Sequence, residues 1–174
     1  DNVGIGKTAI KVVTSGIRNS ALGNQTLMSL TTGSDNVAIG NSAAYNLTTC
    51  DDVVAIGRVA AYSLTTGGGN TCVGKGAGYN ITTGARNICI GQETVTSAVD
   101  GTQQIIIGYE LTGAGNNTFA FGRTTVGRVY NSYGSNASFT RDSDERLKTN
   151  IKEDTLGLNF INNLKTVTFQ WKPN

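Results

Sequence analysis

The chain has 174 residues, among them 23 glycines, a single proline, three cysteines and no histidine, and its formal net charge is +2. A charge this small, without any basic run, argues against a nucleic-acid partner. No stretch reaches the roughly 18 apolar residues of a membrane-spanning helix, so no membrane insertion is expected. Without histidine the chain lacks the commonest metal ligand and general base, and we expect neither a metal nor another cofactor.

One repeat organises most of the chain. A glycine closes a short apolar segment at a constant interval of 17 residues, at Gly6, Gly23, Gly40, Gly57, Gly74, Gly91 and Gly108. A second apolar ladder follows seven residues after these glycines, at Val13, Leu30, Leu47, Leu64, Ile81 and Ala98. Seventeen residues are too few for a two-helix repeat and fit one coil of a β-solenoid. The sequence therefore predicts an all-β fold, a parallel β-solenoid (β-roll) with 17-residue coils.

Each coil is expected to begin with a short strand such as Val37–Ile39, in which large and small side chains alternate. The two large side chains share one face of the strand, and we place them inside the coil. The small middle residues then form an outward stripe that lets another chain approach, at Gly4, Ala21, Ala38, Ala55, Cys72 and Cys89. Because so thin a coil buries little surface alone, this stripe predicts a parallel homotrimer.

The rest of each coil is expected to hold a second extended piece, such as residues 43–47, and a turn at a "TTG" glycine such as Gly33. A left-handed backbone is typical of glycine in such turns. Cys50 takes the place of that glycine in its coil, so Cys50→Gly is expected to raise stability by up to about 1 kcal/mol.

Several polar and aromatic residues also recur in register. The asparagines are interpreted as a ladder of side-chain amides, at Asn2, Asn19, Asn36, Asn70 and Asn87. Asp35 and Asp52 could serve a sugar-cleaving enzyme or bind calcium, but arginines share their register, which favours a solvated ladder of charges. Tyr45, Tyr62 and Tyr79 form a stripe that packing or a contact between chains explains, with contact to sugars as the alternative.

The repeat breaks after Gly108, because the next matching glycine, Gly122, follows after only 14 residues. We therefore divide the chain into a solenoid (1–122), a polar connector (123–142) and a charged C-terminal segment (143–174). In that last segment, apolar spacing predicts a helix around residues 156–164 and a strand around 167–171, which makes a small α/β segment.

The repeat pattern "NVAIG…A.Y…TTG" is similar to the head repeats of trimeric autotransporter adhesins and to repeats of phage and virus tail fibres. The resemblance covers residues 1–122. It implies that three chains form parallel β-rolls around one axis.

The motif "SDERLKTNI" at residues 143–151 allows two interpretations. Asp142 and Glu145 can cap the start of a helix. Alternatively, Ser143 and Lys148 can form a dyad in which a desolvated, neutral lysine activates the serine. "SDERLK.NI" followed by "F.WK" resembles the opening of the intramolecular chaperone domains of phage endosialidases and tail fibres. The resemblance implies a domain that trimerises the fibre and then cuts itself off, with Ser143 as nucleophile and Lys148 as base.

These resemblances lead us to expect a structural or receptor-binding segment of a trimeric viral or phage tail fibre or spike, located in the virion. The expected partners are two further copies of the chain and a host surface receptor or glycan. Apart from self-cleavage, no enzymatic activity is expected. We also expect the chain to be a piece of a longer protein with a truncated chaperone. The alternative is the head of a bacterial trimeric surface adhesin, located at the cell surface.

Overall fold

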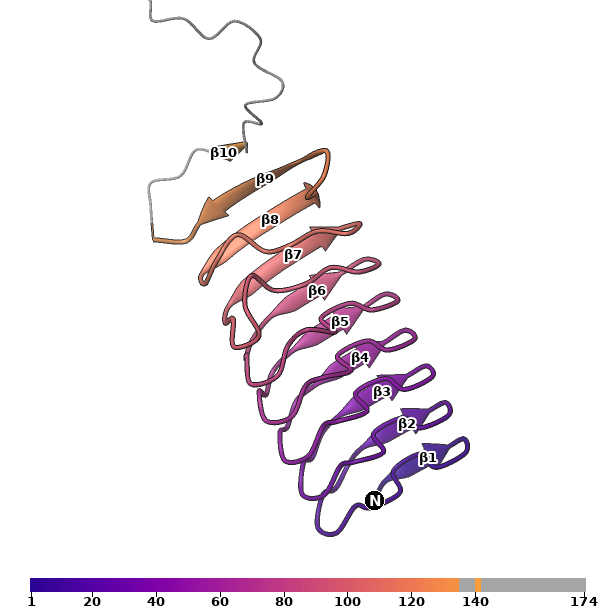
Figure 1. The fold of residues 1–174 in the computed structure, drawn as a ribbon. Helices are drawn as coiled ribbons and strands as arrows, with labels where there is room; N and C mark the ends of the chain where they lie inside the picture. Colours follow the sequence, from indigo (N-terminus) through magenta and orange to yellow (C-terminus); the bar gives the residue numbers. More distant parts are fainter. Residues whose placement is uncertain (135–139, 142–174) are drawn as a thin grey trace, which may run out of the picture. The chain divides into compact units, whose positions relative to one another are not determined.

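The computed structural model describes residues 1–134 and 140–141, and the predicted C-terminal helix and strand lie outside them. The described residues form one ten-stranded sheet in which the strands follow one another in chain order (Figure 1). The strands are β1 (Val3–Ile5), β2 (Ser20–Leu22), β3 (Val37–Ile39), β4 (Val54–Ile56), β5 (Thr71–Val73), β6 (Ile88–Ile90), β7 (Gln104–Gly108), β8 (Thr118–Arg123), β9 (Gly127–Ser132) and β10 (Thr140–Arg141). The predicted all-β parallel solenoid with 17-residue coils is confirmed.

Strands β1 to β8 are parallel and in register. Each residue pairs with the residue one coil later, so Val37 lies beside Val54 and Ile39 beside Ile56. Between β7 and β8 the register holds across the shorter interval of 14 residues, with Ile105 beside Phe119. Every coil therefore presents equivalent repeat positions to its two neighbours, which is why an uninterrupted period in the sequence produces ladders in the structure.

The orientation predicted for the strands is wrong. The small middle residues point into the solenoid and are fully or almost fully buried at Ala21, Ala38, Ala55, Cys72, Cys89 and Ala120. The large residues on either side face outward, and Ile39 is 39% exposed. The small stripe is thus the inner wall of the coil and is not available to another chain.

The interior is filled from the other side of each coil. The second apolar ladder is buried there, at Leu30, Leu47, Leu64 and Ile81. Because these long side chains occupy the space opposite the sheet, only a small residue fits at the middle of strands β2 to β6. Residues 43–47 form turns, so the predicted second extended piece is wrong. Backbone bonds between coils still pair this side, as from the Ala44 N–H to the Ala60 carbonyl at 2.9 Å.

The turns require left-handed backbone at positions different from the predicted ones. The glycines that close strands β1 to β6 have positive φ, as at Gly40 (129°). A Cβ atom on Gly40 would also lie 2.6 Å from the carbonyl oxygen of Gly57 in the next coil. The "TTG" glycines have no positive φ, and neither does Cys50. The backbone strain predicted at Cys50 is therefore absent, and the reason given for expecting Cys50→Gly to stabilise the chain is wrong.

The predicted asparagine ladder is present, and its members from Asn19 onward are buried. The Asn36 side-chain amide donates to Asn19 Oδ1 at 2.9 Å and to the Cys50 carbonyl at 3.0 Å. Its Oδ1 accepts from the backbone N–H of Val53 at 3.0 Å. Asn87 repeats the pattern by donating to Asn70 Oδ1 at 3.0 Å. Each asparagine thus satisfies backbone groups of the turns that stacking has taken out of water.

The direction of the chain reverses after the last parallel strand. Strand β9 runs antiparallel to β8, and β10 is antiparallel to β9. The segment 123–142, expected as a polar connector, thus contributes strands to the same sheet. The chain divides into two compact units, Asp1–Asp142 and Ser143–Asn174, and the second lies outside the described residues.

Candidate functional site

The outward side of the sheet carries a continuous apolar surface, which we call the sheet face. It consists of two ladders, one at Val3, Ser20, Val37, Val54, Thr71, Ile88, Ile105 and Phe119, and one at Ile5, Leu22, Ile39, Ile56, Val73, Ile90, Ile107 and Phe121. All of these residues except Ser20 and Thr71 are apolar. At the usual spacing of about 4.8 Å between strands, the face extends roughly 35 Å along the solenoid.

The sheet face is open to solvent in the single chain. Ile5 is 61% exposed, Leu22 49% and Phe121 41%. Contiguous apolar patches of more than a few hundred Å² are rare on monomeric soluble proteins and mark surfaces of interaction. Burying the face stabilises an assembly by about 25 cal/mol for each Å² of apolar surface removed from water. This surface is therefore suited to contact between chains.

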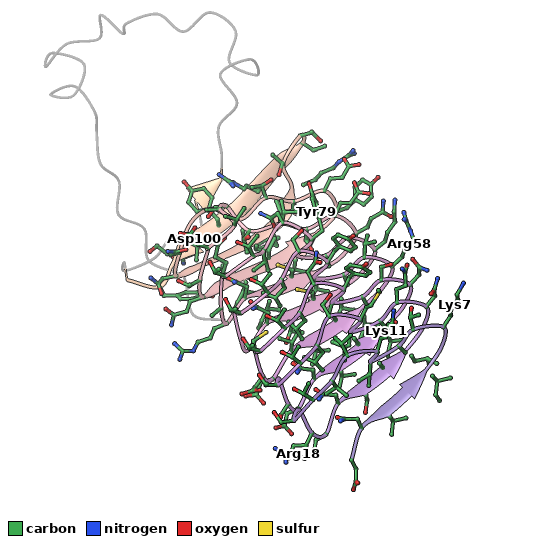
Figure 2. The ribbon with its side chains drawn as sticks, turned by 60° about the horizontal axis from the view of Figure 1, so that its bottom comes forward. Lys7, Lys11, Arg18, Arg58, Tyr79 and Asp100 are labelled. Atoms are coloured by element: carbon green, nitrogen blue, oxygen red, sulfur yellow. The ribbon has the colours of Figure 1, made fainter. Side chains whose placement is uncertain are left out.

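The two long edges of the solenoid carry charged and aromatic side chains. Lys7, Arg58 and Tyr79 lie along one edge, and Arg18 and Asp100 along the opposite edge (Figure 2). On the second edge, the Arg18 guanidinium pairs with the Asp35 carboxylate of the next coil at 2.5 Å.

The hydrogen bond from Arg18 lowers the pKa of Asp35 below its ordinary value. The same pairing raises the pKa of the Arg18 guanidinium. A carboxylate held ionised against an arginine is suited to a ladder of charges and not to proton transfer. This arrangement agrees with the interpretation of Asp35 and Asp52 as part of such a ladder.

The tyrosine stripe is interrupted along the first edge. The rings of Tyr45 and Tyr62 are stacked, with centroids 5.2 Å apart and planes at 16°. No such stacking joins Tyr62 to Tyr79 within the described part of the chain, and Tyr79 is 48% exposed. A hollow of about 400 Å³ opens at this place, lined by Arg58, Val59, Tyr62, Lys75, Gly76, Tyr79 and Glu93.

The cysteines Cys50, Cys72 and Cys89 are free and buried. Burial raises the pKa of the Cys50 thiol to about 12. A hydrogen bond with the Cys89 thiol, together with burial, raises the pKa of Cys72. The Cys50 and Cys72 thiols are therefore not suited to act as nucleophiles, because the reactive form is the thiolate.

The predicted dyad residues Ser143 and Lys148 lie outside the described residues, so their mutual geometry stays a prediction. Within residues 1–134 and 140–141, no cluster of three or more His, Cys, Asp or Glu residues could hold a metal ion. The same part of the chain has no helix long and apolar enough to cross a membrane.

Comparison with known proteins identifies one part of the chain. Residues 143–174 match the family described as chaperone of endosialidase, and this match covers less than a fifth of the chain. No curated protein and no solved structure matches the sequence or the fold. The match supports an intramolecular chaperone domain of the tail-fibre type that begins at Ser143, directly after the unit that contains the solenoid.

Two features of the surface were not predicted from the sequence. The sheet face was missed because the large residues of the strands were placed inside. The hollow was missed although the sequence carries a signal for it, since Gly76 stands where the other coils carry a side chain. Both features lie on the solenoid.

Proposed function

We propose that the chain is a segment of a trimeric viral or phage tail fibre or spike, in which three parallel solenoids pack through their sheet faces. The observation that carries the proposal is the exposed sheet face, from β1 to β8, in a chain whose next segment matches a chaperone of the endosialidase type. The fibre displays a surface for a host receptor or glycan, and its place is the virion.

The physical basis for the trimer is the surface that one copy leaves exposed. The interior of a coil is filled by one row of leucines against one row of small residues, so a single copy has a thin core. Packing three sheet faces around a common axis adds a second core, made of the valine, isoleucine and phenylalanine ladders. The parallel in-register strands place equivalent residues of the three copies at the same height along this axis.

The chaperone match favours a fibre over the head of a bacterial adhesin, which is the alternative that the repeat resemblance alone leaves open. We further propose that the complete gene product cuts itself near Ser143 after trimerisation. The Ser143 hydroxyl attacks a neighbouring peptide carbonyl and gives its proton to the neutral amine of Lys148. The amide nitrogen leaves with a proton, and water hydrolyses the resulting ester.

The assembly is tested by measuring the mass of the chain by light scattering at micromolar concentration. We expect the mass of three chains. Replacing Ile39 and Ile56 together by lysine places charges at the centre of the sheet face and should give monomers. Thr66→Lys, which places a charge on an exposed turn, is the control and should leave the trimer intact. A wild-type mass of one chain would overturn the trimer.

The processing is tested by expressing the complete gene and sizing the product on a denaturing gel. We expect a shortened product from the wild type and a full-length product from Ser143→Ala and from Lys148→Ala. Thr149→Ala lies in the same motif and should still be cut. A wild-type product that remains intact would mean that the motif only caps a helix.

A further inference from the structure

The hollow between Tyr62 and Tyr79 exists because one coil lacks a side chain. The position two residues after each strand-closing glycine has a left-handed backbone in successive coils, with φ of 55° at Ser42, 53° at Val59, 65° at Gly76 and 55° at Glu93. Three of these four residues carry a side chain. Gly76 does not, and the row of side chains along this edge is interrupted there.

Neither strain nor crowding explains the glycine. Residues other than glycine adopt the same φ in the neighbouring coils, so the backbone conformation does not exclude a side chain. A Cβ atom on Gly76 would lie 3.4 Å from Glu93 Cγ and 3.9 Å from Tyr79 Cδ1, which are ordinary contacts. By contrast, a Cβ atom on Gly40 would lie 2.6 Å from a backbone oxygen. The consequence of Gly76 is therefore the open space itself.

The walls of this space combine aromatic rings with an unpaired cation. Tyr62 and Tyr79 both line it, and nearly half of the Tyr79 side chain is exposed. Lys75 is paired with Glu93, with Nζ and Oε1 3.1 Å apart. The Arg58 guanidinium has no ion pair or hydrogen bond to any residue in the described part of the chain, and Arg58 lies on the same edge as Tyr79 (Figure 2). The hollow thus offers ring faces, a free guanidinium, and a lysine–carboxylate pair.

We propose that this hollow binds a saccharide that carries a carboxylate. The apolar C–H face of a pyranose ring packs on the face of a tyrosine, whose π-system is negative and attracts those hydrogens. The carboxylate of the sugar accepts a two-pronged hydrogen bond from Arg58, for which the guanidinium geometry is suited. The hydroxyl groups bond to Lys75 and Glu93, which supply both donors and an acceptor.

The charge of the site decides between neutral and acidic sugars. A neutral sugar would leave the Arg58 guanidinium without a partner, whereas a carboxylate neutralises it. In a trimer the hollow occurs three times at one height, so weak single sites combine into tighter attachment to a surface that presents many such sugars. The proposal rests on the host-attachment role proposed above and names the class of its ligand.

The test measures binding of short oligosaccharides of glucuronate, galacturonate and mannuronate to the full chain by isothermal titration calorimetry. The methyl ester of each oligosaccharide is the matched probe, because it keeps the sugar and removes the charge. We expect at least one acid to bind, and its ester to bind at least tenfold more weakly. If none of the acids binds, or if acid and ester bind equally, the proposal is overturned.

Two variants locate the site. Gly76→Val fills the hollow with the side chain that the preceding coil carries at the same position, as Val59, and it should abolish binding while the chain remains folded. Ser42→Val places the same side chain at the equivalent position outside the hollow, and this variant should bind like the wild type. Arg58→Gln should reduce affinity for the acid to that for the ester. Binding that survives in Gly76→Val would overturn the site.

The mass of these variants separates this proposal from the assembly. If Arg58→Gln or Gly76→Val lowered the mass found by light scattering, the hollow would be a contact between copies and the saccharide site would be wrong. If the wild type were monomeric but bound the acid, the trimer would fail and the site would stand.

Discussion

Replacing Asn36 by valine tests whether the buried asparagine ladder stabilises the solenoid. Valine is the residue that the next coil carries at this position, as Val53, so the change introduces no shape that is foreign to the fold. It removes three hydrogen bonds of the Asn36 side chain, to Asn19, to the Cys50 carbonyl and from the Val53 N–H. Asn36 is fully buried, so water cannot replace them.

The size of the effect follows from the groups left without a partner. The Cys50 carbonyl and the Val53 N–H each lose their partner, and an unsatisfied buried group costs about 1–3 kcal/mol. Asn19 Oδ1 keeps the backbone N–H of residue 36 as a donor. The apolar valine side chain offsets about 1 kcal/mol. We therefore expect Asn36→Val to lower the free energy of unfolding by about 2–4 kcal/mol, or the melting temperature by roughly 5–15 °C.

The native coil with Val53 shows how the ladder compensates for a missing member. There, Asn70 donates to the carbonyl of Gly67 at 2.6 Å as well as to that of Gly84 at 2.8 Å. No asparagine is in reach to do the same for Cys50 in the Asn36→Val variant, because Val53 follows. The reverse change, Val53→Asn, joins the two halves of the ladder and should leave stability unchanged or raise it by about 1 kcal/mol.

The assay is urea unfolding followed by circular dichroism at one fixed protein concentration, because dissociation of an assembly makes stability depend on concentration. The reasoning would be refuted if Asn36→Val changed the unfolding free energy by less than about 0.5 kcal/mol, below the cost of one unsatisfied group. It would also be refuted if Val53→Asn were as destabilising as Asn36→Val.

Three further outcomes are expected. Gly40→Ala should destabilise by several kcal/mol more than Gly115→Ala, since both glycines have φ near 130° but only Gly40 faces a neighbouring backbone; equal losses in urea unfolding would contradict this. The Cys50 thiol should not react with a thiol reagent at pH 8 until the chain is unfolded, and rapid labelling of the folded chain would contradict this. Its folded pKa of about 12 exceeds the unfolded value of about 8.5, so the free energy of unfolding should fall as the pH rises from the unfolded to the folded pKa. The Asp35 pKa should lie below its ordinary value and should rise in Arg18→Gln; a carboxyl NMR titration that shows the same Asp35 pKa in wild type and variant would contradict the pairing. Because the folded pKa is lowered, the contribution of Asp35 to stability is present above the unfolded pKa and is lost as the pH falls through the folded pKa.

The sequence was sufficient to predict the architecture because stacking imposes a strict period. Each coil touches only its neighbours, so a residue type needed at one height is needed again 17 residues later, as Asn19 and Asn36 illustrate. The side of the strand that faces inward could not be read from the strand alone. A three-residue strand shows which side chains share a face, and only the volume left by Leu47 and Leu64 determines that the small residue points in.

The turn conformations were mispredicted for a related reason. Glycine in "TTG" suggests a left-handed backbone from local propensity, but Gly33 lacks a side chain because a Cβ atom there would lie against the carbonyl oxygen of Cys50 in the next coil. The true left-handed positions carry ordinary residues such as Ser42 and Val59 in most coils. Close approach between coils overrides local propensity at these positions, and a single coil contains no information about it.

The change from parallel to antiparallel pairing at β8 and β9 has a consequence for how such solenoids vary in length. Upstream of that reversal, removal of one whole 17-residue coil brings together two coils whose strands already match in register. The solenoid then becomes shorter by one strand spacing, about 4.8 Å, and the remaining strands keep their parallel pairing. Removal of part of a coil shifts all later ladders out of alignment. Gene variants of this solenoid should therefore differ by whole coils upstream of β8, while the hairpin keeps a constant length.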